Sequence, residues 1–192
     1  MCVTDRIGIL RWIAAMLCLG AIDASHAETF DLPRLMQLLA ASPTADVSFT
    51  EKKFSSLLSE PVASSGKLVY LRPDTVEKNI DKPRKESYRF AGEVLVVVRN
   101  GVEKRIPLSS QPLLSAFAAS LRGVLGGDLA LLRNHYQLSL QGDEQSWRLD
   151  MVPADEEIGR YVRRITASGR AGRIAQIEVS ETSGDRSVLQ VH

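Results

Sequence analysis

The sequence contains only two cysteines, Cys2 and Cys18, in a chain of 192 residues. Both lie in an N-terminal segment that has the pattern of a cleaved leader. If the leader is removed, the rest of the chain can form no disulfide, even in an oxidising compartment. The folded protein must then be stabilised by packing alone.

Histidine is also scarce, with three in the whole chain, and no group of His, Cys, Asp and Glu has the spacing of a metal site. The sequence has no phosphate-binding loop, no dinucleotide fingerprint and no Gly-x-Ser-x-Gly turn. Two carboxylates far apart in the sequence could still serve a hydrolase. Because no pairing of a nucleophile with a base is visible, however, we expect neither an enzyme nor a cofactor.

The chain carries no excess of charge of one sign, since 24 basic and 23 acidic residues leave a net charge of +1. A protein that binds nucleic acid usually has a clear basic excess. The balance therefore predicts no nucleic-acid partner and no bulk attraction to an anionic membrane.

No apolar run is long enough to span a bilayer comfortably, because residues 12–22 fall short of the roughly 20 that a helix needs. Arg6 and Arg11 precede this run, and Ser25 and Ala27 place small residues at the −3 and −1 positions of a cleavage site. This layout predicts a cleaved signal peptide over residues 1–27, with a membrane anchor as the alternative. Residues 28–192 are then long enough for one domain with a core.

The remaining sequence changes its hydrophobic period three times. Residues 31–42 have leucines at helical spacing, with Asp31 as the expected N-cap. Two further helices are expected at residues 112–125 and 128–134, where Gly126-Gly127 separates them and Asp128 caps the second. Everything else has strand-like periodicity, broken by a loop-like stretch at 55–65 and an acidic loop at 155–157. The strands are predicted at 46–54, 66–71, 75–81, 84–90, 93–99, 102–107, 135–141, 146–152, 161–168, 173–180 and 186–192.

This order predicts an α+β fold dominated by about eleven antiparallel strands that curl into a barrel or half-barrel. The turns between strands are short, and Asn100-Gly101 is typical of a type I′ hairpin. Such a sheet has one concave face, and the helices at 112–134 are placed to cover it as a lid. A lidded apolar cavity is a binding architecture.

Several motifs resemble those of the LolA family of periplasmic lipoprotein carriers. "VSFTEKKF" places Phe49 and Glu51 where the family has Phe-x-Gln, and "SSGKLVYLRPD" matches its Gly-x-Leu-x-x-x-Arg-Pro at Gly66, Leu68, Arg72 and Pro73. "SWRLDMVP" corresponds to a later strand of the family. The resemblance covers essentially all of residues 28–192.

The resemblance implies an unclosed half-barrel, covered by helices, whose apolar cavity holds acyl chains in the periplasm. A monomeric carrier of this kind takes a lipoprotein from an inner-membrane donor complex and delivers it to an outer-membrane acceptor. The candidate cavity residues are Phe49, Leu68, Tyr70, Leu95, Val97, Tyr136, Leu138, Trp147 and Leu149, with Leu113, Phe117 and Leu121 on the lid. From pattern alone, the same side chains could instead fill the interior of a small barrel.

Arg72 matches the arginine that holds the empty cavity shut in the family. Leu68, Tyr70 and Arg72 share one face of a strand, so Arg72 would point to the cavity mouth. A guanidinium there needs acceptors, and the unpaired carbonyls at the ends of the short lid helices are the expected ones. The alternative is an ordinary surface arginine.

The sequence also departs from the family pattern. Residues 75–83 lack the aromatic Phe-x-Trp that usually follows Arg-Pro, and residues 91–101 carry aliphatic residues where the family has Trp and Tyr. The cargo could therefore be a glycolipid or a polyene lipid rather than a lipoprotein. A lipid-sensing regulatory domain like that of RseB, without net transport, and a purely structural envelope protein remain the alternatives.

Overall fold

The computed structural model describes residues 29–42 and 46–192. The expected signal peptide, residues 1–27, lies outside the described residues. The first element is helix α1 (Leu32–Ala41), and the Asp31 carboxylate accepts a hydrogen bond of 2.9 Å from the Arg34 amide at its start. The predicted helix and its cap are therefore confirmed. Leu35, Met36 and Leu39 form its buried face.

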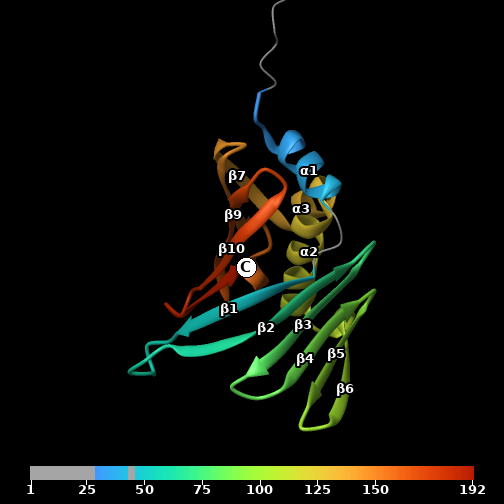
Figure 1. Cartoon of the computed structure of the whole chain (residues 1–192), viewed down its shortest axis with the longest axis vertical. Coiled ribbons are helices and arrows are strands. Elements are labelled where there is room, and N and C mark those ends of the chain that lie inside the picture. The colour runs from blue at the N-terminus through green and yellow to red at the C-terminus, as the bar shows by residue number, and fades with distance from the viewer. Residues whose placement is uncertain (1–28, 43–45) are drawn as a thin grey trace, which may run out of the picture.

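The described part of the chain forms a single sheet of eleven antiparallel strands, in the number that the periodicity predicts. The order across the sheet is β6-β5-β4-β3-β2-β1-β11-β10-β9-β8-β7, so the first and last strands pair with each other in its middle. Strands β6 and β7 are the two edges, which leaves the half-barrel open (Figure 1). The strands are β1 (Asp46–Phe54), β2 (Val62–Leu71), β3 (Thr75–Lys82), β4 (Glu86–Ala91), β5 (Val94–Arg99), β6 (Val102–Pro107), β7 (Tyr136–Asp143), β8 (Ser146–Pro153), β9 (Val162–Arg170), β10 (Arg173–Glu181) and β11 (Arg186–Val191).

The helices between β6 and β7 lie against one face of the sheet (Figure 1). They are a short 3₁₀ helix (Leu108–Ser110), α2 (Pro112–Gly126) and α3 (Leu129–His135). Gly127 ends α2 in the left-handed conformation, with φ of 69°, and the Asp128 carboxylate caps α3 by accepting from the Leu131 amide. The predicted helix boundary at Gly126-Gly127 is confirmed.

Two local predictions are wrong. Residues 62–65 were expected in a loop but belong to β2, because they pair with β1 from Val62 onward. The acidic stretch expected as a loop contains a single helical turn, α4 (Glu156–Gly159), whose start is capped by the Asp155 carboxylate.

The hairpin turn predicted at Asn100-Gly101 lies between β5 and β6. It has positive φ at both residues, as a type I′ turn requires.

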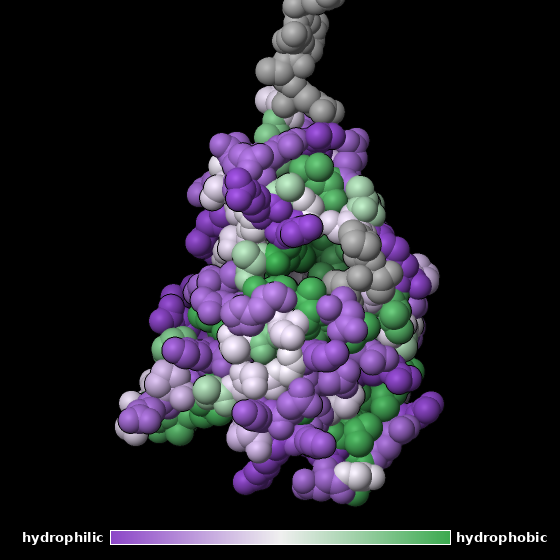
Figure 2. Space-filling model, in the orientation of Figure 1, coloured by the Kyte–Doolittle hydropathy of each residue, from purple (hydrophilic) through white to green (hydrophobic). Residues whose placement is uncertain are grey.

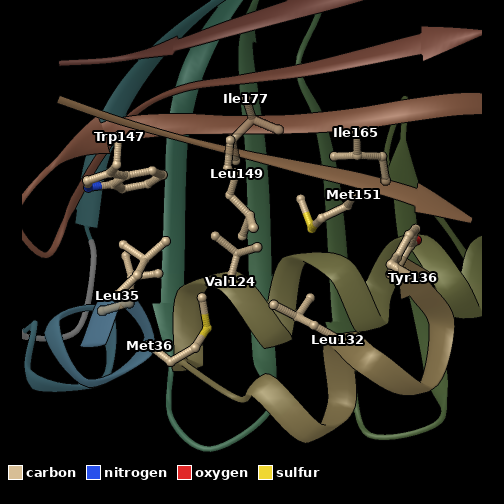
Figure 3. Close-up of a cluster of buried hydrophobic side chains, with 12 residues drawn as sticks. Leu35, Met36, Val124, Leu132, Tyr136, Trp147, Leu149, Met151, Ile165 and Ile177 are labelled. Carbon is tan, nitrogen blue, oxygen red and sulfur yellow. The ribbon is translucent and has the colours of Figure 1, made fainter. Parts of the chain in front are cut away.

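Among the described residues, most of the buried hydrophobic side chains form two clusters on the concave side of the sheet. Figure 3 shows the first, in which Trp147, Leu149 and Met151 point from β8 toward the helices. The second lies between β1–β5 and α2, and it includes Phe49, Leu68 and Leu95. Phe117 and Leu121 of α2 pack against both clusters, so this helix joins the two halves of the core. No helix among the described residues is long and apolar enough to cross a membrane.

Candidate functional site: two apolar cavities under the helices

The concave face of the sheet holds a first cavity of about 520 Å³ next to the end of α1. Figure 2 shows a hollow with apolar side chains at its base below α1. Its walls come from α1, β1, β2, β10, β11 and the ends of α2 and β9. Apolar lining residues include Leu39, Val47, Leu68, Tyr70, Leu125 and Ile177, and polar side chains of Arg170, Arg173, Asp46 and His192 also contribute.

A second cavity, of about 360 Å³, lies beneath α2. Leu114, Phe117 and Leu121 of α2 cover it, and Phe90 and Leu95 of the sheet face them. The Phe90 and Phe117 rings meet edge to face, with their centroids 6.1 Å apart. Both cavities fall within the size range of ligand sites, which are mostly apolar with a few polar groups.

One ion pair stands in the wall of the second cavity. Lys78 Nζ lies 2.7 Å from Glu51 Oε2, and the same carboxylate oxygen accepts a hydrogen bond of 3.1 Å from Ser64. Only 25% and 18% of the two side chains remain exposed. The Lys78 ammonium also lies 5.2 Å from the centre of the Phe49 ring. The pair neutralises two charges that would be costly to place in an apolar wall alone.

Arg72 contacts carbonyl groups, as expected, but on a different helix. Its Nη2 donates hydrogen bonds of 2.6 Å to the Ala40 carbonyl and 2.9 Å to the Ser42 carbonyl, at the C-terminal end of α1. The prediction that its acceptors lie on the helices after β6 is wrong. The reason is local: the end of α2 packs against α1 at Gly127, and the last carbonyls of α1 face the end of β2.

Tyr70 lies beside this contact and lines the first cavity. Its hydroxyl donates to the Pro73 carbonyl at 2.9 Å, and the Arg72 guanidinium lies 5.6 Å from the centre of its ring. Burial raises the pKa of Tyr70, so the phenol stays neutral and remains a hydrogen-bond donor.

The predicted cavity residues divide between the cavities and filled core. Leu68 lines both cavities, Tyr70 lines the first, and Leu95, Phe117 and Leu121 line the second. Phe49 belongs to the second core cluster and Val97 packs against it, and neither lines a cavity. The side chain of Leu113 lies outside the described residues. Tyr136, Leu138, Trp147 and Leu149 lie in or against the first core cluster and line neither cavity.

The last four residues are covered because side chains of α1, α2 and α3 fill the space over β7 and β8. Trp147 Nε1 donates to the Ala171 carbonyl at 2.8 Å, and the Tyr136 hydroxyl donates to the Ala116 carbonyl at 2.8 Å. Burial raises the pKa of Tyr136 to about 12. From the sequence, the inward side chains could either line a cavity or fill the interior of the sheet. The structure has both arrangements: a filled core under β7–β9, and cavities under β1–β5 and β10–β11.

The sequence analysis did not select the lining residues of β10 and β11. Ile177 and Val179 of β10, and Leu189 and Val191 of β11, face the cavities. Their two-residue alternation was visible, but it does not say that these strands neighbour β1. Lys78 was also missed, because a lysine on a strand is ordinarily exposed.

The described residues include no group of three or more His, Cys, Asp and Glu side chains that could hold a metal ion. The arrangement offers apolar space with a few polar side chains at its ends. Such a site can bind an apolar or amphiphilic molecule.

The family model described as "Outer membrane lipoprotein carrier protein LolA-like" matches residues 24–190. No curated protein matches the sequence.

Solved structures with a similar chain course include a LolA superfamily protein from Nitrosomonas europaea, at 14% identity and a TM-score of 0.46, covering 84% of this chain and 89% of that one. A DUF1329 family protein from Desulfovibrio piger has 15% identity and a TM-score of 0.46, with coverage of 84% and 89%.

Proposed function

The chain belongs to the LolA-like family of outer membrane lipoprotein carrier proteins, and from this premise we propose that it is a periplasmic carrier of acyl chains. It would bind the chains of a lipoprotein or another lipid on the concave face of the sheet and move them between the inner and outer membranes. A donor complex at the inner membrane and an acceptor at the outer membrane are the expected partners.

The observation that carries this proposal is the pair of apolar cavities on the concave face of the sheet, one next to the end of α1 and one beneath α2. Each buried methylene contributes about 0.8 kcal/mol, so a chain of about sixteen carbons represents roughly 12 kcal/mol if fully covered. Even partial burial then competes with a membrane for the chain. Opening the protein around the ligand reduces this gain, which keeps the binding reversible.

Transfer of lipid between vesicles tests the proposal. Donor vesicles would carry a fluorescent phospholipid with a quencher, acceptor vesicles would carry neither, and the protein corresponding to residues 28–192 would be added in catalytic amounts. A carrier raises the rate of dequenching in proportion to its concentration. Native mass spectrometry of protein isolated from the periplasm would show the mass of the bound cargo.

The outcomes separate the alternatives. Binding of lipid without transfer, together with a protein that copurifies, supports a regulatory sensor instead of a carrier. A protein that is always empty and binds no fatty chain contradicts both and leaves a structural role.

A further inference from the structure

The two cavities meet at two side chains. Leu68 of β2 and Ile177 of β10 line both of them, and both are almost fully buried, with 3% and 7% of their surface exposed. Each belongs to a different core cluster.

The cavities lie one after the other along the strands. On β1, Val47 lines the first cavity and Glu51 lines the second. On β11, which runs antiparallel to β1, Val191 lines the first and Leu189 the second. These residues are separated by even numbers of positions, so they share the concave face.

Strand β10 gives the length of this row. Ile174 lines the first cavity, Ile177 lines both, and Val179 lines the second. A bulge between Ile174 and Gln176 takes up one residue, so this row spans about four strand steps, or roughly 13 Å. The two cavities lie in series over about that distance.

The charges differ between the two ends. Arg170 and Arg173, which flank the turn between β9 and β10, line the first cavity. Arg170 donates to Gln145, and Arg173 makes no ion pair or side-chain hydrogen bond with another described residue. Asp46, the acidic residue of this lining, lies 3.8 Å from Lys67. At the second cavity, Glu51 and Lys78 neutralise each other.

We propose that the two cavities form one passage for a single long acyl chain, closed in its middle by Leu68 and Ile177. The anionic headgroup of the ligand lies at Arg170 and Arg173, and the chain displaces the two aliphatic side chains to reach the space under α2. This inference rests on the proposed lipid-binding function.

Spin-labelled fatty acids test the path of the chain in the unmodified protein. Stearic acid with a nitroxide at carbon 5 or at carbon 16 would be added to ¹⁵N-labelled protein. The carbon-5 label is expected to remove more than half of the amide signal of Ala175 and Val191. The carbon-16 label should do the same to Val179 and Leu95. The same acids with reduced nitroxides give the reference intensities.

The outcomes distinguish this inference from the function on which it rests. If both labels attenuate the same cavity, or if the pattern is reversed, the passage or its orientation is wrong while lipid binding stands. If unlabelled stearic acid causes no shift in any amide signal, the lipid-binding function fails and the inference fails with it.

A substitution at the boundary gives a second test. Ile177→Phe is expected to lower the affinity for stearic acid more than tenfold and to leave that for decanoic acid within twofold. Each methylene kept out of an apolar site lowers the affinity about fourfold. Excluding two or more methylenes of stearic acid therefore accounts for a loss of more than tenfold. The matched control is Val188→Phe, which adds the same ring to the outer face of neighbouring β11. If Ile177→Phe loses equal affinity for stearic and decanoic acid, or loses none for stearic acid, the proposal is overturned.

Discussion

At the scale of single residues, Arg72 connects the end of β2 to the last turn of α1 through its bonds to the Ala40 and Ser42 carbonyls. We expect Arg72→Leu to weaken this contact and favour an open site. Because the wild-type contact lies at the surface, it contributes about 1 kcal/mol, so the variant should bind a fluorescent fatty acid about fivefold more tightly and release it more slowly.

Equilibrium titration and stopped-flow release measure both effects. The control is Arg84→Leu in the turn between β3 and β4, because Arg84 is exposed and donates no side-chain hydrogen bond to a described residue. Unchanged affinity and release in Arg72→Leu would count against a latch.

Asp150 stabilises the outer face of the sheet in a way that depends on pH. Burial alone would raise its pKa, but the hydrogen bond of 2.6 Å from Thr166 and the ion pair with Arg148 outweigh burial and hold the pKa below its ordinary value. A lowered pKa in the folded state adds stability above the pKa of the unfolded chain. That stability is lost as the pH falls from about 5 through the folded-state pKa.

We therefore expect Asp150→Asn to lower the free energy of unfolding by about 1–2 kcal/mol at pH 7 and by much less at pH 3. Urea denaturation at a series of pH values measures the difference. Asp46→Asn is the control, because its contact with Lys67 is exposed and should change stability by less than about 0.5 kcal/mol at any pH. A loss in Asp150→Asn that stays constant with pH would contradict the assignment.

At the residue scale, the sequence predicts which side chains face inward but not which of them leave space between them. Leu68 and Leu149 have the same strand periodicity, yet Leu68 lines both cavities and Leu149 is packed in filled core. The difference arises from the helices above them. Side chains of α1, α2 and α3 share a core cluster with Leu149, and the positions of these helices depend on contacts between residues far apart in the chain.

At the scale of elements, Gly127 joins α2 to α1. Its φ is 69°, and a Cβ added there would lie 2.2 Å from the Met36 carbonyl oxygen and 2.8 Å from the Ala40 amide nitrogen. We expect Gly127→Ala to cost about 3 kcal/mol or more, because the left-handed strain adds to a clash with backbone that cannot move freely.

Gly101→Ala is the matched control, since Gly101 has a φ of 75° and nothing within 4 Å of the added Cβ. It should cost only about 1–2 kcal/mol of strain. Urea denaturation of both variants isolates the contact between the helices. Equal losses would show that this contact contributes nothing.

Elements with strong local signals are predicted well from the sequence. Helix α1 is defined by its leucines and the Asp31 cap, and the hairpin between β5 and β6 by Asn100-Gly101. The start of β2 was missed because Val62–Ser65 contain small and polar residues whose strand conformation comes from pairing with β1. The turn of α4 was missed because four residues are too few to show a helical period.

At the scale of the whole molecule, the pairing of β1 with β11 brings together the two halves of the chain. The register places Phe49 opposite Val191 and Glu51 opposite Leu189. Local periodicity carries no information about such a pairing. The number of strands could therefore be predicted, but the seam, which is the pairing of β1 with β11, could not. The cavities depend on this seam, because their walls combine β1 and β2 with β10 and β11.

Cavities of about 520 and 360 Å³ leave apolar side chains without close partners, and a ligand that fills them stabilises the folded chain as a whole. A long-chain fatty acid at about 100 times its dissociation constant should add about 2.7 kcal/mol. For a chain of this size, that raises the melting temperature by about 5–10 °C. Differential scanning calorimetry with stearic acid measures the shift. Butyric acid at equal concentration carries the same carboxylate with almost no chain. It should therefore produce almost no shift in the melting temperature. An equal shift with both acids would mean that the carboxylate, rather than burial of the chain, accounts for the stabilisation.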